Sequence, residues 1–164
     1  MNVVVFFTDQ QRWDTTGVHG NPCGLTPNFD KTAMEGTHVY EAFTPQPVCC
    51  PARGVLQTGK YATTVGTYRN ARVLGRTHKT MADYFGEAGY DTGYIGKWHL
   101  GSGRGAVPEE ERGGYQYWLG ANSLEHTSTA YHTVVYDNDN NEVTLPGYRV
   151  DALTDAAIRY IDEH

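Results

Sequence analysis

Segment 49–59 places a thiol beside groups that favour a bound anion; it reads Cys-Cys-Pro-Ala-Arg-Gly-Val-Leu-Gln-Thr-Gly. Pro51 suits the first position of a helix, where its missing N–H costs nothing, and Gly59 predicts the end of that helix. Cys49 then lies at the helix N-terminus, where unpaired N–H groups and the helix dipole favour negative charge. Arg53 follows one turn later and can reach back to the same point. The segment therefore predicts a site that holds an anion against a reactive side chain.

Adjacent cysteines also occur in metal and redox sites, and a buried cysteine can be no more than a small apolar residue. The sequence has no Cys-x-x-Cys and no second cysteine pair at zinc spacing, which argues against a zinc or redox site. Cys23 is expected to be a loop thiol, and three cysteines do not make a disulfide framework.

A short apolar run near the N-terminus predicts a strand that leads to a carboxylate. Val3–Phe7 is rich in β-branched and aromatic residues, as in a strand buried on both faces, and Asp9 and Gln10 follow it. Ligands gather beyond the carboxyl ends of strands in open α/β sheets. We therefore expect Asp9 to offer an oxygen ligand to a hard cation. An aspartate that only opens a turn is the alternative.

A second motif, Gly-Lys-Trp-His-Leu-Gly at 96–101, brings a lysine and a histidine close together. If the chain stays extended, Lys97 and His99 project to one side and Trp98 to the other. A lysine can stabilise charge that develops on an anion during a reaction, and an imidazole can move a proton. Taken alone, a solvated lysine and a hydrogen-bonded histidine would explain the same residues.

Together these motifs resemble the type I sulfatases of the alkaline phosphatase superfamily. Cys-x-Pro-x-Arg followed by Thr-Gly is similar to the sulfatase motif whose cysteine is oxidised to formylglycine, and the lysine–histidine block is similar to its sulfatase counterpart. The resemblance implies that sulfate esters are hydrolysed by the hydrated formylglycine formed from Cys49. It also implies that Arg53 stabilises the diol, that Lys97 contacts the sulfate and that His99 holds the formylglycine hydroxyl.

The resemblance further implies a divalent cation bound by Asp9, Gln10 and the oxygen of the modified Cys49. Ca²⁺ is expected, with Mg²⁺ and Mn²⁺ as alternatives. The family usually has two aspartates where this chain has Asp9-Gln10, as in some choline sulfatases and phosphonate monoester hydrolases, so the identity of the metal stays open. The implied partners are a sulfated small molecule or sugar and a formylglycine-generating enzyme.

The remaining pattern predicts the elements that must position these residues. Helices are predicted at about Pro27–Glu35, Thr80–Ala88 and Val150–Glu163, the last with Leu153, Ala157, Ile158 and Ile161 on one face. Extended segments are predicted at Thr37–Phe43 and in a hairpin of Val134–Tyr136 with Glu142–Thr144. Alternating strands and helices predict an α/β fold in one domain. The resemblance implies an alkaline-phosphatase-like sandwich, a mixed and mostly parallel sheet flanked by helices.

The composition excludes several other classes of protein. The chain has 164 residues and a formal net charge of −6, which argues against non-specific nucleic-acid binding. No apolar run is long enough to cross a membrane. Met1 leads directly into the first predicted strand, so no signal peptide is visible, which favours the cytoplasm over the periplasm or secretion.

Sulfatases are typically several hundred residues long, so the resemblance implies an N-terminal fragment that lacks further metal and substrate ligands. The isolated fragment is expected to be inactive. Two other functions stay open. One is a phosphonate monoester or phosphodiester hydrolase that uses the same residues, since both esters are tetrahedral. The other is a catalytically incompetent domain that binds sulfated ligands.

Overall fold

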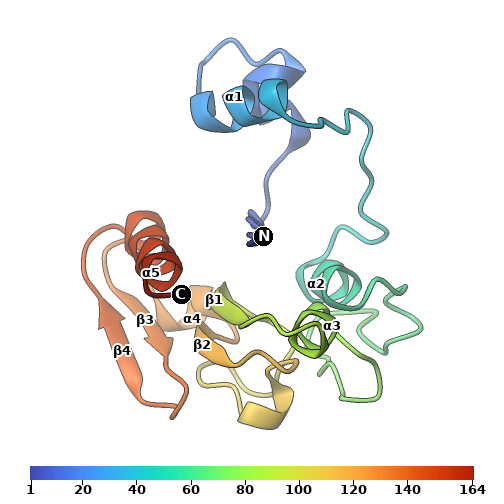
Figure 1. Cartoon of the computed structure of the whole chain (residues 1–164), viewed down its shortest axis with the longest axis vertical. Helices are drawn as coiled ribbons and strands as arrows, with labels where there is room; N and C mark the ends of the chain where they lie inside the picture. Colours follow the sequence, from blue (N-terminus) through green and yellow to red (C-terminus); the bar gives the residue numbers. More distant parts are fainter. The chain divides into compact units, whose positions relative to one another are not determined.

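The computed structural model describes residues 1–164, and its backbone contacts form two units, Met1–Thr44 and Pro45–His164 (Figure 1). The first unit contains helix α1 (Pro27–Glu35) and two 3₁₀ turns, η1 (Trp13–Thr15) and η2 (Gly17–His19). Helix α1 agrees with the prediction, and Gly36 ends it by donating its N–H to Thr32 O at 2.9 Å.

The two strands predicted in this first unit are not formed, so both predictions are wrong. Val3–Phe7 and Thr37–Phe43 have no strand assignment, and the side chains of Val3 to Phe7 are exposed. A strand exists only where a second strand accepts its backbone hydrogen bonds. The unit Met1–Thr44 contains no such partner strand, whatever the apolar pattern of its residues.

The second unit contains a four-stranded mixed sheet in the order β1-β2-β3-β4. Its strands are β1 (Gly93–Lys97), β2 (Tyr117–Ala121), β3 (Thr133–Tyr136) and β4 (Glu142–Leu145). Strands β1 and β2 are parallel, while β3 is antiparallel to both β2 and β4. The β3–β4 pair is the predicted hairpin. Strand β2 was not predicted.

Four helices and one 3₁₀ turn accompany this sheet: α2 (Cys49–Thr58), α3 (Met81–Glu87), η3 (Glu109–Glu111), α4 (Leu124–Thr127) and α5 (Arg149–Glu163). Helix α3 forms where predicted and begins with a capping box, because the Thr80 hydroxyl accepts from Asp83 N and the Asp83 carboxylate accepts from Thr80 N at 2.8 Å. No helix is both long enough and apolar enough to cross a bilayer.

Helix α5 forms where predicted, but its predicted apolar face is buried only in part, with Leu153 packed against the core. Its fully buried residues are Ala152 and Ala156, whereas the predicted core residues Ile158 and Ile161 are about half exposed. The reason is a close approach to the sheet. A Cβ at Gly93 in β1 would lie 2.6 Å from the ring of Tyr160, so glycine and alanine are needed where helix and strand meet.

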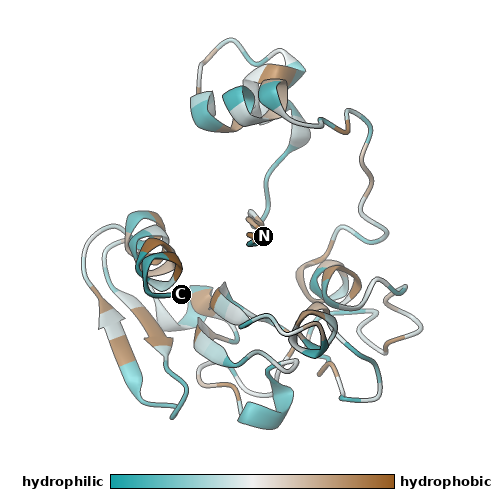
Figure 2. Ribbon diagram, viewed as in Figure 1, coloured by the Kyte–Doolittle hydropathy of each residue, from teal (hydrophilic) through white to brown (hydrophobic).

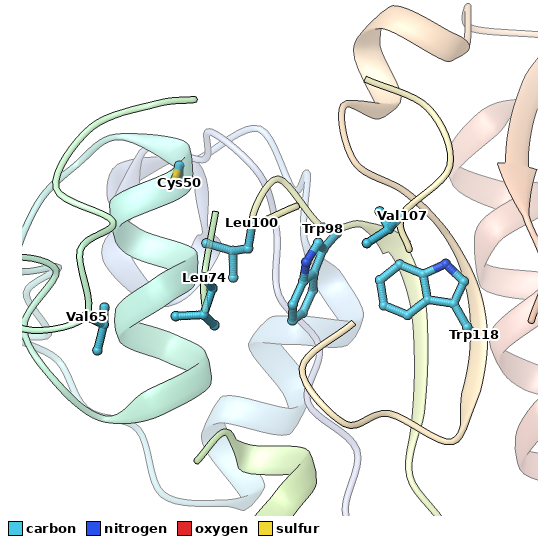
Figure 3. Close-up of a cluster of buried hydrophobic side chains, with 7 residues drawn as sticks. All are labelled: Cys50, Val65, Leu74, Trp98, Leu100, Val107 and Trp118. Atoms are coloured by element: carbon cyan, nitrogen blue, oxygen red, sulfur yellow. The ribbon is translucent and has the colours of Figure 1, made fainter. Parts of the chain in front are cut away.

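The sheet separates two apolar clusters, because neighbouring residues of a strand face opposite sides. On one side Tyr94 and Trp118 stack with ring centroids 5.2 Å apart, beside the cluster that contains Cys50 of α2. In Figure 3, Trp98 lies between Leu100 and Trp118 within this cluster. On the other side Leu119 packs with residues of α5, and Figure 2 shows apolar residues on both β3 and α5. The second unit therefore has helices on both faces of its sheet.

Helix α2 depends on a glycine at its centre. A Cβ at Gly54 would lie 3.0 Å from Thr67 Cβ and closer still to the Thr67 hydroxyl. We expect Gly54→Ala to lower the free energy of unfolding by about 1–3 kcal/mol, because the helix would have to move away from Thr67. Urea denaturation of the protein measures the change.

The matched control is Gly86→Ala in helix α3, where an added Cβ meets no atom within 4 Å. There we expect a gain of about 0.5–1 kcal/mol, since alanine is the better helix former. Thr67→Ala should recover part of the loss in Gly54→Ala. Equal effects at the two glycines would contradict this account of the packing.

Candidate active site

Helix α2 begins at Cys49, two positions before the predicted first residue, Pro51. Ala52 N donates to Val48 O at 2.9 Å, which makes Val48 the N-cap, and Val48 has no side-chain cap to offer. Asn70, from a distant loop, supplies that function by accepting from Cys50 N at 3.1 Å. Cys49 thus lies in the first turn, at the positive end of the helix dipole.

The two cysteines of the motif have different surroundings. Cys49 is half-buried, whereas Cys50 is fully buried and its thiol donates to Arg72 O at 3.4 Å. Burial is the main cause that raises the pKa of the Cys50 thiol, only partly offset by that hydrogen bond. Cys50 is therefore an inert member of the core. Cys23 is exposed, as predicted for a loop thiol.

Arg53 joins helix α2 to the end of strand β1. Its side chain is only 7% exposed, and Nη1 donates to Lys97 O at 2.6 Å and to the Tyr94 hydroxyl at 3.4 Å. The Tyr94 hydroxyl also donates to Lys97 O. The two motifs that the sequence singled out are thus adjacent in the structure, and Arg53 provides the contact between them.

Strand β1 ends at Lys97, and the chain does not stay extended through His99. Trp98 is fully buried, while Lys97 and His99 are half-buried. His99 has a φ of 59°, in the left-handed region that costs a non-glycine residue about 1 kcal/mol. Its N–H donates to Asn122 O at 2.7 Å, which helps to hold this conformation. The prediction that Lys97 and His99 project to the same side required an extended chain, and the chain is extended only as far as Lys97.

Lys97 forms an ion pair that was not predicted from the sequence. Its Nζ donates to Glu125 Oε1 at 3.0 Å, from a side chain that is only 11% exposed. Glu125 lies in the short helix α4 and is more exposed than its partner. Burial acts to raise the pKa of Glu125, but its backbone hydrogen bond and Lys97 outweigh this and lower the pKa. Glu125 therefore fixes the position of the lysine.

His99 also lies in the wall of a cavity of about 580 Å³. Asn122 fixes the glycine-rich segment 101–103 in the cavity wall. Its Oδ1 accepts from Gly101 N at 2.9 Å, and its Nδ2 donates to the carbonyls of Gly101 and Gly103 at 2.7 Å. The cap residue Asn70 lines the same cavity. The start of α2 and the segment after β1 are therefore both connected to this cavity.

The predicted metal ligands fall in two different units of the structure. Asp9 and Gln10 belong to the first unit, and Cys49 to the second. Asp9 Oδ1 accepts from Gln10 N at 2.8 Å. No group of three or more His, Cys, Asp or Glu side chains could hold a metal ion. The oxygen donors of Asp9 and Gln10 suit a hard cation in kind but make up only part of a coordination shell. The metal site stays a prediction.

Comparison with known proteins identifies relatives of the whole chain. The family model described as Sulfatase matches residues 1–164. An ulvan-active sulfatase from Formosa agariphila is 38% identical over 99% of this chain and 32% of its own length. The chain spans a quarter to a third of the length of the curated relatives that it matches.

Two solved structures also match. The protein yidJ from Bacteroides fragilis has a TM-score of 0.84 at 26% identity, over 94% of this chain and 38% of that one. BT4656, in complex with its substrate D-glucosamine-2-N,6-O-disulfate, has a TM-score of 0.82 at 25% identity, over 95% of this chain and 30% of that one.

The Lys97–Glu125 pair predicts a pH dependence of stability. Because folding lowers the pKa of Glu125, the stabilisation is present above the ordinary glutamate pKa and is lost as pH falls through the folded value. We expect Glu125→Gln to lower the free energy of unfolding by at most about 1 kcal/mol near pH 7, since Glu125 is partly exposed. The difference should shrink as pH falls below the ordinary glutamate pKa of about 4.3 and vanish only below the lowered pKa of the folded protein.

Urea denaturation of both forms at several pH values measures this difference. Glu142→Gln is the matched control, since Glu142 is exposed in β4 and has no ion pair. A difference that stays constant from pH 7 to about pH 3 would rule out the ion pair as its cause.

Proposed function

Because this chain belongs to the sulfatase family, we propose that the protein containing it hydrolyses sulfate esters, with Cys49 oxidised to formylglycine as the nucleophile. The family match and the two structural matches confirm the alkaline-phosphatase-like α/β fold for the part that this chain spans. The activity itself is our proposal, since the relatives are about three times longer or more.

One observation carries the proposal beyond family membership. The hydrogen bond from Arg53 Nη1 to Lys97 O, 2.6 Å long, connects the helix that begins at Cys49 to the segment that carries Lys97 and His99. The four residues proposed as catalytic therefore come from two segments in direct contact. A nucleophile, a cation and a titratable group near one another are what the transfer of an anionic group requires.

The proposed reaction uses the hydrate of formylglycine at position 49, after a formylglycine-generating enzyme and an external oxidant have converted the thiol to an aldehyde. One hydroxyl oxygen of the hydrate attacks sulfur, and the bond from sulfur to the alcohol oxygen breaks. The second hydroxyl then loses its proton and expels sulfate as the aldehyde re-forms, and water restores the hydrate. Serine has no second hydroxyl and could not release the sulfate in this way.

The neighbouring side chains have separate roles in this reaction. Lys97 stabilises charge that builds up on the sulfuryl oxygens. His99 receives or supplies the proton of the diol. Arg53 stabilises the diol and, by its bond to the carbonyl of Lys97, holds the lysine segment against α2. Asp9 and Gln10 would provide oxygen ligands to a divalent cation, which when bound polarises the ester and makes the nucleophile more acidic.

We further propose a sulfated sugar as substrate. The support comes from relatives, namely the ulvan-active sulfatase and BT4656, whose substrate is a disulfated glucosamine. Aryl and choline sulfates are the alternatives with a different leaving group. Turnover of a panel of the three ester types by the whole protein distinguishes them.

Replacement of Cys49 tests the nucleophile. In the whole protein, produced together with a formylglycine-generating enzyme, we expect Cys49→Ala to lower kcat by at least about 10³-fold. Cys49→Ser should react at most once and retain sulfate on the serine, which mass spectrometry of the tryptic peptide detects. Cys23→Ser is the control, because Cys23 is exposed and lies in the other unit.

The same peptide from the unsubstituted protein should contain formylglycine. Unmodified cysteine in a fully active protein would overturn the proposed nucleophile. Phosphonate turnover equal to or greater than sulfate turnover would instead favour a phosphonate monoester hydrolase that uses the same residues.

A further inference from the structure

Basic residues are concentrated in one part of an otherwise acidic chain. The formal net charge is −6, yet segment 42–82 contains no Asp or Glu. The basic residues of that segment are Arg53, Lys60, Arg69, Arg72, Arg76 and Lys79. This segment includes the start of α2 and one wall of the cavity beside His99. Positive charge is thus placed next to the proposed catalytic residues.

Two of these basic side chains are paired with carboxylates. A third, which lines the cavity, is not. Arg76 pairs with Asp83 at 2.6 Å, and Lys79 pairs with Glu87 at 2.5 Å. Arg72 has no carboxylate within 4.0 Å, although it is half-buried and lines the cavity. Its charge is therefore available to a ligand.

The surroundings of Arg72 hold its side chain in place but leave one donor unpaired. The guanidinium carbon lies 4.7 Å from the centre of the Tyr68 ring, and Nη2 donates to the Tyr68 hydroxyl. Nε is buried and has no hydrogen-bond partner. A buried donor on a charged group costs free energy until an acceptor reaches it. Because Nε is buried, an anion in the cavity would be bound by the outer nitrogens of the Arg72 guanidinium.

The rest of the cavity wall also suits an anion. Arg104, in the segment that follows β1, also lines it, is exposed and forms no ion pair. Glu125 is the one carboxylate in the wall, and it is bonded to Lys97 at 3.0 Å. The volume of about 580 Å³ lies within the range of sites that hold small ligands. The cavity therefore has room for a sugar and two arginines to bind its charge.

The loop that carries Arg72 is fixed to the nucleophile helix. Ala71 has a φ of 59°, a conformation that alanine rarely adopts and that persists only where its neighbours enforce it. Cys50 enforces it on both sides, because its N–H donates to Asn70 Oδ1 and its thiol donates to Arg72 O. Leu74 N adds a bond of 2.7 Å to Leu100 O. The cavity is thus formed before any ligand binds, and these bonds fix its position relative to the start of α2.

We propose that this cavity binds a second anionic group of the substrate, a carboxylate or a further sulfate, so that the substrate is an acidic sulfated sugar. The inference rests on the proposed sulfatase function and narrows it. The planar guanidinium of Arg72 matches the two oxygens of a carboxylate or sulfate. A choline group would meet like charge here, and a neutral aryl group would offer Arg72 no anionic partner.

Binding measured without turnover tests this directly. The whole protein with Cys49→Ala is titrated calorimetrically with a sulfated disaccharide that contains a uronate, and with the same disaccharide after its carboxylate is reduced to an alcohol. A third probe carries a second sulfate in place of the carboxylate. We expect Arg72→Gln to weaken binding of the two doubly anionic probes by about 10- to 100-fold. The reduced probe should change by less than about 3-fold, since one hydrogen bond to a neutral group contributes little.

Two further variants separate recognition from folding and from overall charge. Arg104→Gln removes an exposed side chain and should lower affinity for the same two probes without a change in thermal unfolding. Arg69→Gln makes the same change of charge outside the cavity wall and should leave all three affinities unchanged.

Equal weakening of all three probes by Arg72→Gln would overturn the proposal, as would equal affinity of the Cys49→Ala protein for the charged and reduced disaccharides. Failure of the proposed function has a different signature. The protein with Cys49 intact would then hydrolyse no sulfate ester, while the Cys49→Ala protein would still prefer the doubly anionic probes.

Discussion

The structure of the site depends on one buried guanidinium. Arg53 could not be buried at such low exposure unless strong acceptors replaced the water it loses, and the carbonyl of Lys97 is one such acceptor. Because that carbonyl closes strand β1, the bond fixes the distance between the helix that starts at Cys49 and the strand end that presents Lys97. Movement of α2 away from the sheet would expose the charge and uncover Cys50 in the core beneath it.

The elements that could be predicted from the sequence are those whose determinants are local. The cap at Thr80, the stop at Gly59 and the β3–β4 hairpin each depend on residues within a few positions of one another. The prediction of strands fails where the presence of a partner strand decides whether a segment forms one. Val3–Phe7 has the composition of a strand but no partner in its unit, and β2 lies in a glycine- and tyrosine-rich segment that is ambiguous by pattern alone. The start of α2 at Cys49 could not be predicted, because Asn70, whose side chain accepts from the first turn, lies in a loop twenty positions after Cys50.

The sequence alone was enough to single out the reactive residues of the site. It was not enough to find the residues that hold them in position. Cys49, Lys97 and His99 stand out by motif, and their roles remain predictions. Glu125 and Asn122 are ordinary polar residues whose importance comes only from folding, which brings α4 and the end of β2 against the end of β1. Their bonds cross more than twenty positions of sequence, beyond the reach of any local pattern.

The ion pair at Lys97 imposes a condition on how an anion can bind there. Glu125 cancels most of the lysine's charge beyond their own separation of 3.0 Å, so the pair attracts an anion only at short range. Screening by salt removes what remains of its field beyond about 8 Å. Attraction over the width of the cavity must then come from cations without a carboxylate partner. Arg72 and Arg104 satisfy that condition within the cavity wall, and a ligand with only one anionic group, held at Lys97, would leave both of them without an anionic partner.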